Sequence, residues 1–325
     1  MATHSQSRVF EDTHINQFGK CRVLLFEAEA DFRRHTREML IEMGFDNILD
    51  TGEFEGFQSA FGSGKFDLII GDTSAARGNV CDLVRRIRHN VYGVDPFPGV
   101  ILTMADPSEE KIRQAAESGT DHLIAKPYSP NQVLERIQTI VEERKRFIVT
   151  LNYVGPERRE GYQNSSPDEL IMVPNALRAK ARNDPSALAT PETVRAAMNR
   201  INRLKVQRHA LEIGVLVEML RSAPSSDVSG RSESRLRKMA ELVTTLQSIL
   251  PATEFGEAAP MCEGMQVVIH DISKADSLTK PELNRLEETS MALHLCFHPE
   301  KTVSNITREI ADAVAAIGKR SRKAL

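Results

Sequence analysis

The sequence contains few of the residues on which several protein classes depend. Its 325 residues include four cysteines, Cys21, Cys81, Cys262 and Cys296, which lie far apart and form no Cys-x-x-Cys pair. Such spacing fits neither a disulfide framework nor a zinc cluster, so we expect reduced thiols in the core or at the surface. Lys and Arg number 42 and Asp and Glu 45, which gives a formal net charge of −3. The chain therefore has no global excess of positive charge that would indicate nucleic acid or a membrane surface as a partner.

No stretch of the sequence is apolar for long. None approaches the roughly 18 uninterrupted apolar residues that a membrane-spanning helix needs. The amino-terminal MATHSQSRVFED also lacks the apolar run of a secretion signal. We therefore expect a cytoplasmic protein without membrane insertion. A chain of 325 residues exceeds the usual size of one domain, so two domains are the natural expectation and one large domain is the runner-up.

The apolar pattern changes near residue 150. Before it, short apolar strands alternate five times with amphipathic helices. The expected strands are 21–26, 47–51, 66–71, 99–103 and 122–125, and the expected helices are 30–43, 54–62, 80–88, 108–118 and 130–144. Such alternation predicts an α/β domain of the (βα)5 type with a doubly wound parallel sheet, whose function lies beyond the carboxyl ends of the strands. Two helix starts carry capping patterns, Asp106-x-x-Glu109 and Ser129-Pro130-x-Gln132.

Polar side chains stand where four of these strands end. Glu27 follows the first strand, Asp72 the third and Lys126 the fifth, while Thr103 ends the fourth. A single carboxylate after a strand is usually a turn former or a helix cap. Four compatible groups at four such places instead predict one small site, because the carboxyl ends of parallel strands meet at one edge of the sheet.

This constellation resembles the receiver domain of bacterial response regulators. The resemblance covers about residues 20–145, and its most specific pieces are Asp72 after Leu68-Ile69-Ile70, then Thr103, Gly119 and Lys126-Pro127. In that family, the aspartate after the third strand takes a phosphoryl group from the phosphohistidine of a sensor histidine kinase or a phosphotransfer protein. By position, the resemblance makes Asp72 the phosphoacceptor.

The resemblance also implies roles for the residues around Asp72. Attack of a carboxylate on phosphorus needs a divalent cation on the carboxylate and phosphoryl oxygens, and lysine and hydroxyl groups on the remaining oxygens. Lys126 and Thr103 would be those holders. Glu27, Asp72 and the main-chain carbonyl of Ser74 would face the metal, and Mg²⁺ is the expected ion because all of these ligands are oxygens.

Two positions depart from the family pattern. Receivers of this type usually carry two adjacent acids after the first strand, but here Glu27 is followed by Ala28. A magnesium site that lacks one carboxylate ligand should be weakened or lost. In the fifth strand, Leu123 stands where many receivers have an aromatic residue that moves between buried and exposed states. Tyr128 is a candidate for part of that role.

The second half of the chain is predicted to be helical. Apolar residues recur at three- and four-residue steps over 194–215, 236–250, 262–272, 283–297 and 303–317, with Thr279-x-x-Glu282 as a cap. These stripes predict an α-helical bundle, and a homodimer is expected but not required. The expected domains are an N-terminal tail (1–19), the receiver (20–145), a linker (146–167) and a helical output or interaction domain (168–325).

The linker carries two features of its own. Phe147–Leu151 is apolar enough to pack back on the receiver, and Gly155-Pro156 is a turn signal. Arg158 and Arg159 could clamp a phosphate, but a solvated or salt-bridged arginine pair is favoured.

The helical half matches no recognised output type. A diguanylate cyclase, a Walker-loop activator and a metal-dependent phosphodiesterase would each show motifs that this sequence lacks. The best candidate for a DNA-reading helix is 195–208, whose basic residues include Arg200, Arg203, Lys205 and Arg208. No short turn precedes this helix, so a solvated face is favoured. Histidine phosphotransfer at His209 or His294 is weaker than a buried or capping role for these residues.

The sequence therefore predicts a response regulator without enzymatic activity of its own. It would accept a phosphoryl group on Asp72 in a phosphorelay and signal through a helical region that binds a downstream protein. One alternative is a phosphorylation-independent pseudo-receiver that serves as a scaffold, which predicts no magnesium dependence. A second alternative is a DNA-binding transcriptional regulator, which predicts steeply salt-dependent binding to duplex DNA.

Overall fold

Five short apolar strands form one parallel sheet in the computed structural model, in the order β2-β1-β3-β4-β5. The strands are β1 (Arg22–Phe26), β2 (Asn47–Thr51), β3 (Leu68–Asp72), β4 (Gly99–Met104) and β5 (His122–Ala125). The structure describes residues 18–74, 78–158, 169–222, 230–274 and 279–323. Every residue of β3 and β4 is buried, because both strands lie inside the sheet and helices cover both faces.

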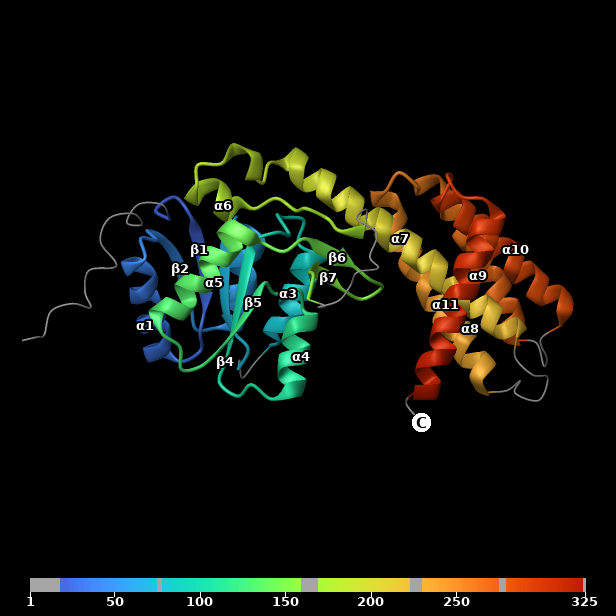
Figure 1. Ribbon diagram of the computed structural model, residues 1–325, viewed down its shortest axis with the longest axis horizontal. Helices are drawn as coiled ribbons and strands as arrows, with labels where there is room; N and C mark the ends of the chain where they lie inside the picture. The colour runs from blue at the N-terminus through green and yellow to red at the C-terminus, as the bar shows by residue number, and fades with distance from the viewer. Residues whose placement is uncertain (1–17, 75–77, 159–168, 223–229, 275–278, 324–325) are drawn as a thin grey trace, which may run out of the picture. The chain divides into compact units, whose positions relative to one another are not determined.

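A helix follows each strand and returns the chain to the start of the next (Figure 1). The helices are α1 (Ala30–Glu42), α2 (Phe54–Ser63), α3 (Val80–Arg88), α4 (Glu109–Glu117) and α5 (Pro130–Glu143). α1 and α5 cover one face of the sheet, where their buried side chains include Met39, Leu40, Val133 and Ile137. α2 and α3 cover the other face with side chains that include Phe57, Phe61 and Val84. The predicted doubly wound (βα)5 fold is confirmed.

The two helix starts singled out in the sequence behave differently. At α5, the Ser129 amide donates to Gln132 Oε1 at 2.8 Å, as part of the predicted capping box. At α4, the prediction is wrong, because Ser108 occupies the N-cap position and makes no side-chain cap hydrogen bond. Asp106 instead accepts a hydrogen bond from Lys111 at 2.8 Å, which draws its carboxylate away from the helix start.

A hairpin follows α5. Its strands are β6 (Phe147–Val149) and β7 (Val154–Pro156), which pair in antiparallel fashion. Phe147 and Val149 are buried, so the expected packing of this segment is confirmed. Gly155 and Pro156 do not form a turn, because the chain has already reversed where the Thr150 amide donates to the Tyr153 carbonyl. They continue β7, and proline is tolerated there because this sheet has only edge strands.

An ion network lies beneath the Phe147 ring. The fully buried Arg88 donates to Asp121 Oδ2 at 2.9 Å, and Arg144 Nε donates to Asp121 Oδ1 at 2.9 Å. Both guanidinium groups stack on Phe147, with 5.1 Å and 5.2 Å to the ring centroid. Burial alone would raise the pKa of Asp121, but Arg144 and Arg88 together hold it below the usual range. The hairpin therefore completes the core of the sheet domain.

Two glycines let the hairpin approach the turn before β5. Gly119 has a φ of +92°, and a Cβ atom there would lie 2.5 Å from the Val154 carbonyl oxygen. A Cβ atom on Gly155 would lie 2.7 Å from the Gly119 Cα atom. Only glycine meets both the backbone conformation and the contact at position 119.

By its contacts, the chain forms two compact units, one up to Met198 and one from Asn199. The first unit includes α6 (Ala176–Ala181), which packs against α5. The Asn175 side-chain amide, at the N-cap of α6, donates to the Ile140 carbonyl at 2.7 Å. The sequence-based domain boundaries stay a prediction, and in the structure residues 169–198 pack in the first unit.

The second unit is helical. Its elements are α7 (Pro191–Arg221), which begins in the first unit, α8 (Gly230–Ile249), α9 (Ala259–Lys274), α10 (Lys280–Phe297) and α11 (Val303–Lys323). α9 packs against both α8 and α10, and the predicted stripe on α8 from Leu236 to Leu250 is buried. The cap at α10 is confirmed, because the Thr279 amide donates to Glu282 Oε2 at 2.8 Å.

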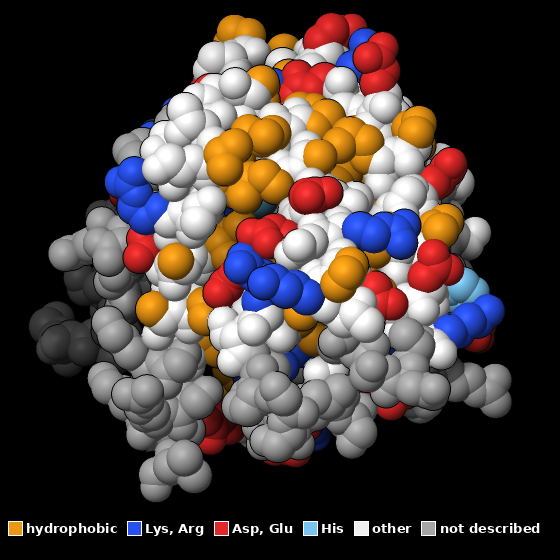
Figure 2. Space-filling view, turned by 90° about the vertical axis from the view of Figure 1, so that its right-hand side faces the viewer, with side chains coloured by type: hydrophobic (Ala, Val, Ile, Leu, Met, Phe, Trp, Pro, Cys, Tyr) orange, Lys and Arg blue, Asp and Glu red, His pale blue; other side chains and the backbone are white. Residues whose placement is uncertain are grey.

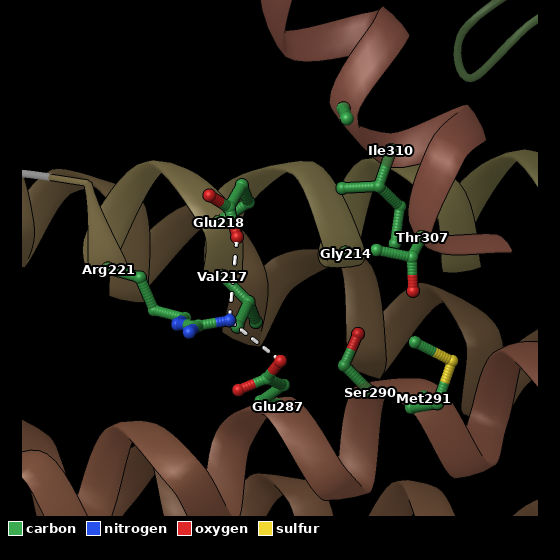
Figure 3. Close-up of a pocket in the computed structure, with 10 residues that line it drawn as sticks. Gly214, Val217, Glu218, Arg221, Glu287, Ser290, Met291, Thr307 and Ile310 are labelled. Carbon is green, nitrogen blue, oxygen red and sulfur yellow. Dashed lines mark hydrogen bonds and ion pairs between the residues drawn. The ribbon is translucent and has the colours of Figure 1, made fainter. Parts of the chain in front are cut away.

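α11 buries fewer of its apolar side chains in this unit than its apolar stripe predicts. Among its described side chains, Ile306 is fully buried, whereas Val303 is 51% and Ile317 37% exposed. A pocket of about 160 Å³ separates part of α11 from α7 and α10 (Figure 3). A Cβ atom on Gly214 of α7 would lie 2.6 Å from Ile310 Cδ1, so glycine leaves room for the Ile310 side chain of α11 there.

Two expectations concern the chain as a whole. Cys21, Cys81 and Cys262 are buried and Cys296 is half-buried, all as free thiols. Across the described residues, none of the helices is both long enough and apolar enough to traverse a lipid bilayer.

Candidate functional site

Four side chains predicted from the sequence meet at the carboxyl edge of the sheet. Asp72 is the last residue of β3 and is paired in register with Thr103 of β4. Glu27 follows β1, and its amide donates to the Thr51 carbonyl of β2 at 3.2 Å. Lys126 follows β5, and its amide donates to the Met104 carbonyl of β4 at 2.8 Å. The backbone ladder thus brings the four groups to one level.

Lys126 connects the two acids. Its Nζ atom lies 2.5 Å from Glu27 Oε2 and 3.2 Å from Asp72 Oδ2. The side chains of all three residues are 10% exposed or less, so water screens these ion pairs little. The ammonium group is therefore shared unequally, with its shorter contact to Glu27.

The backbone around Glu27 also fixes its carboxylate. Glu27 Oε1 accepts a hydrogen bond from the Glu29 amide at 3.1 Å, and the Glu27 carbonyl accepts one from Arg33 Nη1 at 2.8 Å. Burial raises the pKa of Glu27, although the hydrogen bond from Lys126 acts in the opposite direction. Both carboxylate oxygens of Glu27 are thus already bonded.

Asp72 has one oxygen left over. Its Oδ1 atom is buried and has no hydrogen-bond partner. The neighbouring backbone is well fixed, because the Thr103 carbonyl accepts hydrogen bonds from the Thr73 amide at 2.9 Å and from Thr73 Oγ1 at 3.1 Å. Ser74 is exposed beside the site. A buried carboxylate oxygen without a partner is available as a nucleophile or as a metal ligand.

The oxygen ligands at this edge of the sheet meet the needs of Mg²⁺ only in part. Among the described residues, no three His, Cys, Asp or Glu side chains are placed together to hold a metal ion. Asp72 Oδ1 is free, but Glu27 Oε2 is taken by Lys126, and the exposed Ala28 offers no oxygen. The carboxylates of Asp72 and Glu27 fit an ion that keeps several waters, provided that Lys126 releases Glu27.

Sequence reasoning missed two residues near Lys126, Phe32 and Thr36. The Lys126 ammonium lies 4.9 Å from the centroid of the Phe32 ring, and Phe32 packs edge-on against Tyr128. The Tyr128 hydroxyl is 2.9 Å from Thr36 Oγ1. Phe32 and Thr36 are four residues apart on α1, so helical spacing could have placed them on one face, but not against the lysine.

The arginine pair after the hairpin is only partly described. Arg158 donates from Nη2 to the Thr120 carbonyl in the turn before β5. Arg158 therefore holds the hairpin to this turn, and Arg159 lies outside the described residues.

The histidines weighed for phosphotransfer are both buried. His209 is 3% exposed and His294 is fully buried. Burial, with His298 stacked at 5.1 Å, lowers the pKa of His294 to about 4. A phosphotransfer histidine must reach its partner from the surface, so the buried role favoured by the sequence is confirmed for both residues.

The helix considered for DNA reading is not a uniformly solvated basic face. Lys205 is 5% exposed, and burial lowers its pKa to about 8. Arg203 forms an ion pair with Glu254. On the face of the helical unit in Figure 2, acidic and basic side chains are interspersed around two groups of hydrophobic side chains.

Comparison with known proteins covers about a third of the chain. No family model matches the chain. The chemotaxis protein CheY of Pseudomonas aeruginosa is 24% identical over 121 residues, which are 37% of this chain and 96% of the relative. The phosphate regulon transcriptional regulatory protein PhoB of Escherichia coli is 26% identical over 120 residues, which are 37% of this chain and 51% of the relative. The chain thus spans about half the length of PhoB.

A solved structure covers the same part. The chemotaxis response regulator CheY4 of Vibrio cholerae is 19% identical, covers 36% of this chain and 96% of its own, and has a TM-score of 0.33. The sequence matches cover the part of the chain that forms the parallel sheet in the order β2-β1-β3-β4-β5. The N-terminal part of the chain is a receiver domain of the CheY type, which matches response regulators, and a helix-rich region follows it.

Proposed function

We propose that the protein is a cytoplasmic response regulator of a phosphorelay that accepts a phosphoryl group on Asp72. One observation carries this proposal: Asp72 Oδ1 is buried without a partner beside the Lys126 ammonium, which lies 3.2 Å from the other carboxylate oxygen. A free carboxylate next to a fixed cation is arranged to bond a phosphoryl group and to hold its charge.

The phosphoryl transfer is a single displacement at phosphorus. An Asp72 oxygen forms a bond to phosphorus while the P–N bond of a phosphohistidine on a kinase or phosphotransfer protein breaks, and the leaving imidazole nitrogen takes a proton from water. Lys126 moves from Glu27 towards the new phosphoryl oxygens, and the Thr103 hydroxyl holds a further oxygen. Asp72, Glu27 and the Ser74 carbonyl would hold Mg²⁺, which neutralises charge on the carboxylate and phosphoryl oxygens when bound.

The helix-rich region is the proposed output. It would bind a downstream protein, and a change in the charge at Asp72 would shift the population of receiver states that this region experiences. Self-association into a homodimer is part of the proposal, because several exposed apolar side chains, among them Val303 and Ile317, lie on α11.

The contact between Lys126 and Glu27, which limits metal binding, also favours a second candidate function. Lys126 bonds Glu27 at 2.5 Å, and Ala28 replaces the second acid. Both features suit a pseudo-receiver scaffold whose ion pairs are permanent and whose helical region binds its partner constitutively.

The two candidates separate in one experiment. The full chain, the Asp72→Asn variant and the exposed control Asp82→Asn are incubated with acetyl phosphate, with and without Mg²⁺, and their intact masses are recorded. The proposal expects a magnesium-dependent phosphoryl adduct on the wild type and on Asp82→Asn, and none on Asp72→Asn. Oligomeric state is then measured with a beryllofluoride mimic. No adduct on any form and no response to the mimic would overturn the proposal in favour of the scaffold.

A further inference from the structure

The Lys126 ammonium has a third neighbour besides the two carboxylates. The centroid of the Phe32 ring lies 4.9 Å from Nζ, within the range in which an aromatic face attracts a cation. Lys126 is only 10% exposed, so this attraction competes with little water. The negative potential of a ring face attracts the ammonium, but the ring has no lone pair that accepts a hydrogen bond from an N–H group. The ammonium can therefore be held near the site while its N–H groups stay available.

Phe32 is itself held in place by a residue of the loop that carries Lys126. Tyr128, two residues beyond Lys126, packs edge-on against Phe32 with ring centroids 5.8 Å apart and planes at 70°. This is a favoured geometry for aromatic pairs, because the ring edge is positive and the ring face negative. The lysine and the aromatic residue that supports its cation–π partner thus belong to one loop.

A hydrogen-bond chain fixes Tyr128 to the same turn of α1. Thr36 Oγ1 donates to the Phe32 carbonyl at 2.8 Å. Because a hydroxyl has one proton, the 2.9 Å contact between Thr36 Oγ1 and Tyr128 must be donated by the tyrosine hydroxyl. Thr36 is 1% and Tyr128 9% exposed. Phe32, Thr36 and Tyr128 form a closed set that we call the lysine support.

We propose that Phe32 is a positioning residue for Lys126, held against it by Tyr128 and Thr36, and that it sets how readily Asp72 accepts a phosphoryl group. The inference rests on the proposed function. Without the ring, the ammonium would be held by its two carboxylates alone, of which Glu27 is the closer. The ring holds Nζ at a point from which it reaches Asp72 as well.

The first test is kinetic. Phe32→Leu removes the ring face and keeps an apolar side chain, whereas Phe32→Tyr keeps the ring. With acetyl phosphate as donor, Phe32→Leu should lower kcat/KM for adduct formation about two- to fivefold, mainly through kcat, and Phe32→Tyr should restore it. Phe61→Leu makes the same change in an aromatic pair on α2, which carries no residue of the site, and should leave kcat/KM unchanged.

A double-mutant cycle separates positioning from general damage. In a Lys126→Met background, Phe32→Leu should leave the residual rate unchanged, because the group it positions is gone. An equal loss in both backgrounds would show a merely structural role and overturn the inference. If Phe32→Leu fails to fold, Tyr128→Phe replaces it in the cycle, because that variant keeps the packing and removes only the hydrogen bond to Thr36. It should give a smaller loss that also vanishes in Lys126→Met.

The second test needs no phosphoryl transfer. The ε-methylene protons of Lys126 should show an upfield ring-current shift by NMR in the wild type and in Phe32→Tyr, and should lose it in Phe32→Leu. A wild-type signal without the shift would overturn the inference alone. The shift together with no adduct on the wild type would overturn the proposed function and the positioning role with it. Equal kcat/KM values for wild type and Phe32→Leu would overturn the inference only.

Discussion

Glu27 accepts a hydrogen bond from Lys126 at 2.5 Å, at the place where a divalent cation would draw on the same carboxylate. A cation can use Glu27 only by displacing the ammonium, so the ion pair and the metal compete for one ligand. Because of this competition, we expect the site to hold Mg²⁺ weakly.

Restoring a second acid should therefore tighten magnesium binding. Ala28 is exposed next to Glu27, so Ala28→Asp adds a carboxylate without filling the core. We expect the affinity for Mg²⁺ to rise about tenfold, which corresponds to roughly 1.4 kcal/mol, as measured by titration calorimetry. Ala30→Asp adds the same charge at the first residue of α1 and should change affinity much less. Equal gains for both variants would indicate general electrostatic attraction instead of a ligand.

The Asp121 network should be a main source of stability for the sheet domain. Asp121→Asn leaves Arg88 and Arg144 buried without a carboxylate, and such a loss costs about 3 to 5 kcal/mol of the free energy of unfolding. Asp82→Asn breaks an exposed ion pair with Arg85 and should cost about 0.5 kcal/mol or less. Urea unfolding of both variants measures the difference. Similar costs would mean that hydrogen bonds to the surrounding backbone carbonyls already stabilise the two buried guanidinium groups.

Acid should destabilise the helical unit through its buried histidines. The pKa of His294 is about 4 in the folded state and about 6.5 when unfolded, so the unfolded state binds more protons between these values. The contribution of His294 to the free energy of unfolding is therefore complete above pH 6.5, and roughly 3 kcal/mol of it is lost as the pH drops to 4. Burial also lowers the pKa of His209 and His298, which adds to the loss.

The matching variant is His294→Leu. Its free energy of unfolding should depend less steeply on pH between 6.5 and 4 than that of the wild type, whereas the exposed His270→Leu on α9 should keep the wild-type slope. An unchanged slope in His294→Leu would assign the acid sensitivity to other groups.

Ile306 should contribute strongly to the attachment of α11. Ile306 is fully buried, so Ile306→Ala should cost about 2 to 5 kcal/mol, and hydrogen exchange should accelerate in α11 before it does in α8 or α9. Ile317→Ala removes a side chain that is 37% exposed and should cost less than 1 kcal/mol. Exchange that accelerates equally in all helices would show that α11 unfolds only with the whole unit.

The sheet and the four strand-end residues could be predicted because they depend on local patterns. Once β3 and β4 are known to be parallel neighbours, Asp72 and Thr103 must end at the same edge. The short contact between Lys126 and Glu27 could not be predicted, since it depends on which of two acids a flexible side chain meets. The position of Phe32 depends on how α1 is rotated against the sheet, and no sequence period fixes that rotation.

Other errors have a similar origin. Gly155 and Pro156 indicate a turn by composition, but the hydrogen bond between Thr150 and Tyr153 closes the turn earlier. Lys205 lies in a basic stretch typical of a solvated face, yet its side chain is buried on α7. A nearby backbone hydrogen bond overrules local composition in the first place, and burial of the side chain overrules it in the second.

The close approach of Gly119 and Gly155 makes two positions that are distant in the sequence depend on each other. A side chain at either glycine would push the hairpin away from the turn, and the Phe147 ring would leave the arginines that it covers. The hairpin therefore cannot be removed alone, because the residues at 88, 119 and 144 are suited to its presence. Receiver and hairpin are expected to fold as a single unit.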